Sequence, residues 1–134
     1  EEAQVAMSHL KLTVRVCYSN PPAHGGLVVA TVLKDDALTA QWTEELTQMR
    51  ERIVNMRTAL VDGLVGRGIT QDFSYIKTQR GMFSFSGLSD DAVTWLKENK
   101  SIYVVGGGRI NVAGLTSQNM DYVCDAIAQA LKNT

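Results

Sequence analysis

Arg109 follows three consecutive glycines, Gly106–Gly108, and opens a short run of β-type residues. A guanidinium carries a permanent charge and a planar fork of N–H donors, which matches a carboxylate or a phosphate. Glycines beside it leave room for a ligand to approach the backbone. The pattern indicates an anion-recognition site, and the alternative is a solvated arginine at the end of a hairpin.

Arg15 is a second candidate for binding an anion. It lies shortly before the segment Ser19–Pro22, where two prolines in succession should end the preceding helix. A side chain at such a junction is held by a rigid neighbour and still reaches open space. The alternative is an exposed helix charge without a function.

Other chemical motifs are less specific. Ser8 and Lys11 have the Ser-x-x-Lys spacing that places a nucleophile beside a base in some hydrolases, but no supporting motif accompanies them. His9 and His24 have no acidic residue spaced to complete a metal site, so we expect no metal. No helix pattern follows Gly106–Gly108 as a phosphate-binding loop requires, which favours a turn with positive φ or close backbone packing.

The composition limits the possible functions. The chain has 134 residues, 45% apolar and 20% charged, which is enough for one folded domain with a core. A net charge of −1 provides no general attraction for nucleic acid or an acidic membrane, and no apolar run could span a bilayer. Cys17 and Cys124 are predicted to be core thiols. The first residues resemble no signal peptide and lack a Met, so we expect the chain to begin within a longer protein.

The strongest secondary-structure pattern is a long amphipathic helix. Apolar residues recur at spacings of three and four from Leu38 to Leu64, after a cap at Asp35 or Asp36 and before Gly66–Gly68. Because so long a helix usually bridges two packing environments, we place a domain boundary within it. Its basic residues alternate with glutamates and are predicted to lie on a solvated face; they include Arg50, Arg52 and Arg57.

The remaining segments predict a mixed α+β layer with few strands. Helices are expected over 2–16, over 27–33 as a short buried helix with a strand as the alternative, over 89–100 with Ser89 as the cap, and at the end of the chain with Thr116 as the cap. β-structure is expected over 73–76, over 82–86 with Phe83 and Phe85 sharing one core-facing side, and as a hairpin over 102–115.

Three segments together carry a resemblance to one family. Tyr18–Gly25, Gly81–Leu88 and Gly108–Leu115 resemble the C-terminal part of aspartate aminotransferases, pyridoxal-phosphate enzymes of class I. The resemblance covers essentially the whole chain, in order. It implies that residues 49–134 form the small domain of a fold-type I transferase, a few-stranded sheet packed with helices. Residues 1–48 would then be the helical end of the large α/β domain.

The resemblance also implies roles for five residues. Arg109 matches the arginine that binds the substrate α-carboxylate, and Phe83 matches an aromatic that lines the pocket beside it. Arg15 matches the arginine that binds the distal carboxylate in the partner's site of a homodimer, and Ser19 and Asn20 match loop residues near that site. The implied substrates are dicarboxylic amino acids and 2-oxo acids, in the cytoplasm or the mitochondrial matrix.

The chain also departs from the family pattern. The family's Schiff-base lysine, the aspartate on the pyridine nitrogen, the phosphate cup and the stacking aromatic precede the segment that matches this chain. We therefore expect no catalytic and no cofactor-binding residue here, and no activity from the chain alone. Two alternatives remain open: an aminotransferase for aromatic amino acids, and a non-catalytic anion-binding or interaction module.

Overall fold

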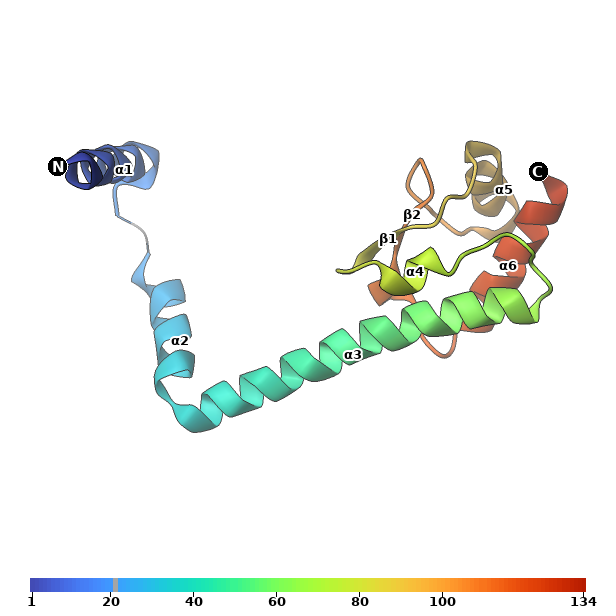
Figure 1. The fold of residues 1–134 in the computed structure, drawn as a ribbon, viewed down its shortest axis with the longest axis horizontal. Helices are drawn as coiled ribbons and strands as arrows, with labels where there is room; N and C mark the ends of the chain where they lie inside the picture. The colour runs from blue at the N-terminus through green and yellow to red at the C-terminus, as the bar shows by residue number, and fades with distance from the viewer. Residues whose placement is uncertain (21) are drawn as a thin grey trace. The chain divides into compact units, whose positions relative to one another are not determined.

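The computed structural model describes residues 1–20 and 22–134; Pro21, one of the two prolines expected to end the first helix, lies outside the described residues. The chain divides into two compact units, Glu1–Glu45 and Leu46–Thr134, each of which is described by itself. Figure 1 shows the elements in chain order. They are α1 (Glu2–Tyr18), α2 (Ala23–Lys34), α3 (Asp36–Gly66), α4 (Tyr75–Thr78), β1 (Phe83–Phe85), α5 (Asp90–Lys100), β2 (Arg109–Asn111), a 3₁₀ turn (Val112–Gly114) and α6 (Met120–Asn133).

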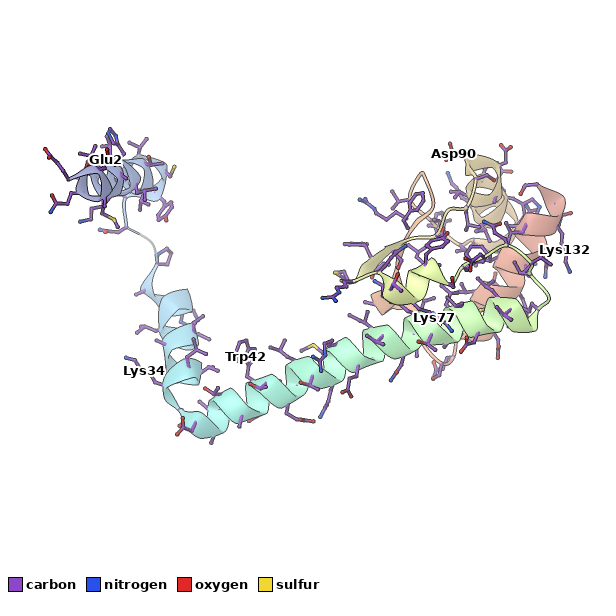
Figure 2. The ribbon with its side chains drawn as sticks, viewed as in Figure 1. Glu2, Lys34, Trp42, Lys77, Asp90 and Lys132 are labelled. Atoms are coloured by element: carbon purple, nitrogen blue, oxygen red, sulfur yellow. The ribbon has the colours of Figure 1, made fainter. Side chains whose placement is uncertain are left out.

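The first unit is helical. The predicted helix over 2–16 is confirmed as α1, and the helix predicted over 27–33 lies within α2. The prediction that this second helix is buried is wrong, since Leu27 is 63% exposed and no described side chain of α1 or α2 is buried. Cys17 is exposed as well, against the expectation of a core thiol. So few helices cannot enclose one another's apolar faces, and side chains project all round α1 (Figure 2).

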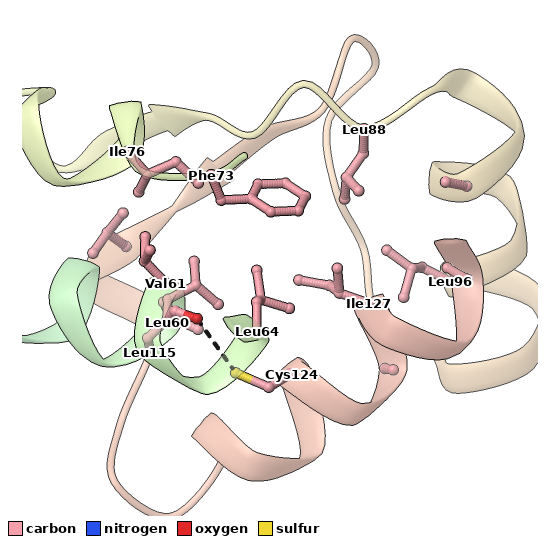
Figure 3. Close-up of a cluster of buried hydrophobic side chains, with 14 residues drawn as sticks. Leu60, Val61, Leu64, Phe73, Ile76, Leu88, Leu96, Leu115, Cys124 and Ile127 are labelled. Atoms are coloured by element: carbon pink, nitrogen blue, oxygen red, sulfur yellow. Dashed lines mark hydrogen bonds between the residues drawn. The ribbon is translucent and has the colours of Figure 1, made fainter. Parts of the chain in front are cut away.

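The long helix α3 has the predicted bounds. Asp35 is its cap, because its Oδ1 accepts a hydrogen bond from the backbone N–H of Leu38 at 3.0 Å. In the second unit, Leu60, Val61 and Leu64 of α3 lie at the centre of the core (Figure 3). Buried residues from the rest of that unit surround them, among them Phe73, Ile76, Leu88, Leu96, Val112, Leu115 and Ile127.

The sheet has two antiparallel strands, β1 and β2, so the α+β prediction is confirmed. The strand predicted over 73–76 is wrong, because a helical turn, α4, begins at Tyr75 and occupies the second half of that segment. The backbone N–H of Ser74 donates to Oδ1 of Asp72 at 2.8 Å, a local bond that starts a turn. The hairpin predicted over 102–115 is also different: Val105 and Arg109 form an isolated bridge, and β2 pairs with β1.

The burial predicted for β1 is reversed. Phe83 and Phe85 are more than half exposed, whereas Ser84 and Ser86 are buried. The hydroxyl of Ser84 accepts a hydrogen bond from Arg57, and the hydroxyl of Ser86 donates to the Gly108 carbonyl at 2.5 Å. Because alternate residues of a strand face opposite sides, placing the serines inward places both phenylalanines outward.

Two helix starts test the predicted caps. Ser89 caps α5 as expected, since its Oγ accepts a hydrogen bond from the Ala92 N–H at 3.1 Å. The last helix starts at Met120 with Asn119 at its cap position, three residues after the predicted cap, Thr116. Thr116 and Asn119 instead hydrogen-bond each other, each side chain accepting from the other's backbone N–H. This local pairing extends the turn before α6.

α3 and α6 approach closely at Gly63. Cys124 is buried as predicted, and its Sγ donates to the Leu60 carbonyl at 3.8 Å (Figure 3). Burial raises the pKa of this thiol. A Cβ at Gly63 would lie 2.7 Å from Sγ of Cys124, whereas a Cβ at Gly66 would meet nothing within 4 Å.

We therefore expect opposite effects from two alanine substitutions in α3. Gly66→Ala should leave the melting temperature unchanged or raise it, because alanine favours a helix by up to about 1 kcal/mol over glycine. Gly63→Ala should lower it, because overpacking costs about 1–3 kcal/mol. Thermal melts of the full-length protein measure both. Adding Cys124→Ala should restore most of the loss; equal melting temperatures for the two single variants would contradict the close approach.

Candidate functional site

One face of the two-stranded sheet carries the predicted arginine and aromatic residues together. The register pairs Phe83 with Asn111 and Phe85 with Arg109, so these four side chains share a face. Cζ of Arg109 lies 5.6 Å from the centroid of the Phe83 ring, a cation–π distance. The structure thus brings together two of the five predicted site residues, Arg109 and Phe83.

The backbone beside Arg109 is held on both sides. The N–H of Arg109 donates to the Val105 carbonyl and the N–H of Val105 donates to the Arg109 carbonyl, both at 3.2 Å. The Gly108 carbonyl accepts from Ser86 twice, from its backbone N–H at 2.8 Å and from its hydroxyl at 2.5 Å. Gly107 and Gly108 both have φ of 74°, so the predicted positive-φ turn is confirmed.

The Arg109 side chain is exposed. Within residues 1–20 and 22–134, its guanidinium has no hydrogen bond and no carboxylate partner, and its close contact is the Phe83 ring. Arg67 is different, since it pairs with Asp121 at 3.1 Å and with Asp125 at 2.5 Å. A guanidinium whose backbone is held in place and whose N–H donors make no other hydrogen bond can bind a carboxylate through two hydrogen bonds.

The other three predicted site residues lie in the first unit. Arg15 is in the last turn of α1, and its carbonyl accepts from the backbone N–H of Ser19 at 3.1 Å. Arg15 and Ser19 both line an open pocket of about 410 Å³, with Lys11 and apolar residues of α1, and Asn20 follows exposed. The Ser8 hydroxyl donates to the Val5 carbonyl at 2.7 Å rather than to a lysine, so the Ser-x-x-Lys pattern builds no catalytic pair.

Two arginines of α3 that were expected on a solvated face donate hydrogen bonds to residues far along the chain; Arg52 is exposed as expected, whereas Arg57 is buried. Nη2 of Arg52 donates to the Leu115 carbonyl at 2.8 Å, and Nη1 donates to the Ala113 carbonyl at 3.3 Å. Arg57 is only 1% exposed and donates to four oxygens around β1. The burial of Arg57 could have been predicted from its spacing. Arg57 is four residues after Ile53 and three before Leu60, which places it on the apolar face of the helix.

The residues present do not fit a pyridoxal-phosphate site. A lysine that forms a Schiff base is usually desolvated or beside another cation, whereas the six lysines of this chain are exposed or half-buried. Lys77 is paired with Asp62 at 2.7 Å, and Nζ of Lys100 lies 5.8 Å from the Trp95 ring. Among the described residues, no group of three metal-binding side chains is found, and no helix has both the length and the apolar character to cross a membrane.

Comparison with known proteins identifies the family. The family model described as aminotransferase class I and II matches residues 3–127. This chain belongs to that family.

The chain is 50% identical over 131 residues to the aspartate aminotransferase of Escherichia coli (strain K12). The aligned region covers 98% of this chain and 33% of that protein.

Solved structures agree with this assignment of the fold. An aromatic-amino-acid aminotransferase from Burkholderia pseudomallei, covalently bound to pyridoxal phosphate, has a TM-score of 0.93 and 51% identity over 97% of this chain and 33% of that one. A mitochondrial aspartate aminotransferase from Trypanosoma brucei has a TM-score of 0.91 and 42% identity, over 96% of this chain and 34% of that one. The chain thus spans about a third of its relatives' length. Relatives named as cytoplasmic and as mitochondrial both occur.

Proposed function

We propose that this chain is the carboxylate-binding part of an aspartate aminotransferase, which exchanges an amino group between L-aspartate and 2-oxoglutarate with pyridoxal phosphate. The observation that carries the proposal is the environment of Arg109. Its guanidinium lies over the Phe83 ring with its N–H donors available, and hydrogen bonds to Val105 and Ser86 hold the backbone at Arg109 and Gly108. Residues 1–48 would be the helical end of the large domain. Residues 49–134 would be the small domain, which closes on the substrate.

The two arginines have separate tasks in this proposal. Arg109 binds the α-carboxylate, which every amino-acid substrate has, and Phe83 shapes the pocket beside it. Arg15 binds the distal carboxylate in the partner's site of a homodimer, with Ser19 and Asn20 nearby. A dicarboxylate bound at both ends has its reacting carbon oriented. Each charge-assisted pair stabilises the complex by about 1.5–3 kcal/mol.

The rest of the protein has to supply the chemistry. Pyridoxal phosphate withdraws electrons from the substrate when it is bound, and no lysine of this chain fits the site that holds it. This chain's own contribution is to bind and orient carboxylates and to exclude water on closure. We place the protein in the cytoplasm, with the mitochondrial matrix as the alternative, since relatives are named for both.

A second candidate is an aromatic-amino-acid aminotransferase. It is favoured by the solved structure of 51% identity that bears this name. Turnover of L-tyrosine and L-aspartate by the full-length protein separates the two. No turnover of either would favour a non-catalytic anion-binding module.

Arg15→Ala tests the distal-carboxylate role. In the full-length protein, kcat/KM for L-aspartate should fall about 10- to 150-fold, which corresponds to the loss of one charge-assisted pair. Turnover of L-alanine, which has no distal carboxylate, should change little. Lys11→Ala is a matched control, because Lys11 lines the same pocket one turn earlier in α1. Equal losses with aspartate and alanine would contradict the role.

A further inference from the structure

Arg57 connects α3 to α4, to the residues just before β1 and to the first two residues of β1. Its Nη2 donates to the Gly81 carbonyl at 2.6 Å and to the Phe83 carbonyl at 3.1 Å. Its Nη1 donates to the Ser84 hydroxyl and, at 3.2 Å, to the Ile76 carbonyl. One acceptor therefore lies in α4, one lies two residues before β1, and two lie within β1.

The chemistry of this contact is specific to arginine. Each of the four acceptors is an uncharged oxygen, so a buried cation is stabilised here by carbonyl and hydroxyl dipoles alone. Burial lowers the pKa of Arg57, but a guanidinium still stays protonated. Its planar fork reaches several acceptors at once, whereas a lysine ammonium has three donors at a single atom. A lysine at this position would leave at least one of the four acceptor oxygens without a hydrogen bond.

We propose that Arg57 is a positioning residue for the substrate carboxylate, acting through β1. This inference rests on the proposed function, because it concerns the same site. Arg57 holds the carbonyl of Phe83, whose ring lies under Arg109. It also holds Ser84, which pairs with Ile110 in β2, the residue after Arg109. The contact therefore sets the strand register on which the Arg109–Phe83 geometry depends.

Arg57→Lys in the full-length protein tests the role. We expect the KM for L-aspartate to rise about five- to tenfold while kcat stays within about twofold, because ground-state and transition-state binding of the carboxylate weaken alike. Hydrogen exchange should become faster at residues 81–86 and 109–111 but not in α6. In an Arg109→Ala background, Arg57→Lys should add less than about a twofold effect.

Arg67→Lys is the matched control. Arg67 directly follows α3 and also makes several hydrogen bonds, but to Gly63, Asp121 and Asp125, away from the sheet. It should lower the melting temperature and leave the KM within about twofold. An unchanged KM for Arg57→Lys, or an equal rise for Arg67→Lys, would overturn the positioning role. If the wild-type protein transaminates no amino acid, the proposed function fails and this role with it. Hydrogen exchange then shows separately whether Arg57 orders β1.

Discussion

Arg109→Ala in the full-length protein should lower kcat/KM for every amino-acid substrate, by roughly a hundredfold or more. The substitution removes both hydrogen bonds and the charge that would face the α-carboxylate. Leaving one partner of a desolvated charge pair unmatched costs about 2–5 kcal/mol. Steady-state kinetics with L-aspartate and L-alanine should therefore show the same loss for both, in contrast to Arg15→Ala.

Two further variants sharpen this test. Arg109→Lys should restore only a small part of the activity, because an ammonium has no planar fork to match a carboxylate. Lys97→Ala, which removes an exposed cation from α5, should change kcat/KM by no more than about twofold. Activity within about threefold of wild type for Arg109→Ala would rule out the assigned role.

Gly108→Ala is expected to have the second-largest effect. Gly108 has φ of 74°, and a Cβ there would lie 2.8 Å from Oγ of Ser86, 2.9 Å from N of Leu88 and 3.1 Å from its carbonyl oxygen. Positive φ costs a residue with a Cβ about 1–2 kcal/mol, and overpacking costs about 1–3 kcal/mol more. We expect a clearly lower melting temperature and, because Arg109 follows directly, a raised KM.

The neighbouring glycines provide a graded control. Gly107 also has φ of 74°, but the atom nearest its added Cβ is in the Phe85 ring at 3.9 Å, so Gly107→Ala tests backbone strain alone. Gly106 has neither a positive φ nor any atom within 4 Å of an added Cβ. Melting temperatures should fall in the order Gly106→Ala, Gly107→Ala, Gly108→Ala. Three equal values would contradict the packing described for this turn.

Much of the fold could be predicted because its signals are local. The spacing of apolar residues along α3, the Asp35 and Ser89 caps and the glycine turn before Arg109 all depend on neighbours within a few residues. The strand predicted over 73–76 is wrong for a local reason too, since the hydrogen bond that the Ser74 N–H donates to the Asp72 carboxylate favours a turn. The motifs around Arg109 and Arg15 were sufficient to indicate the family.

The sequence by itself determined the helices α1, α2, α3 and α5, the positive-φ turn and the residue types that can bind a carboxylate, because hydrogen bonds and side-chain spacing within a few residues specify these features. Only the tertiary structure decided which face of β1 is buried. The alternation of phenylalanine and serine fits either orientation, and Arg57, which is 27 residues earlier than Ser84, selects the one with the serines inside. That choice places Phe83 under Arg109, since a period-two strand cannot turn one side chain inward without turning its neighbours outward.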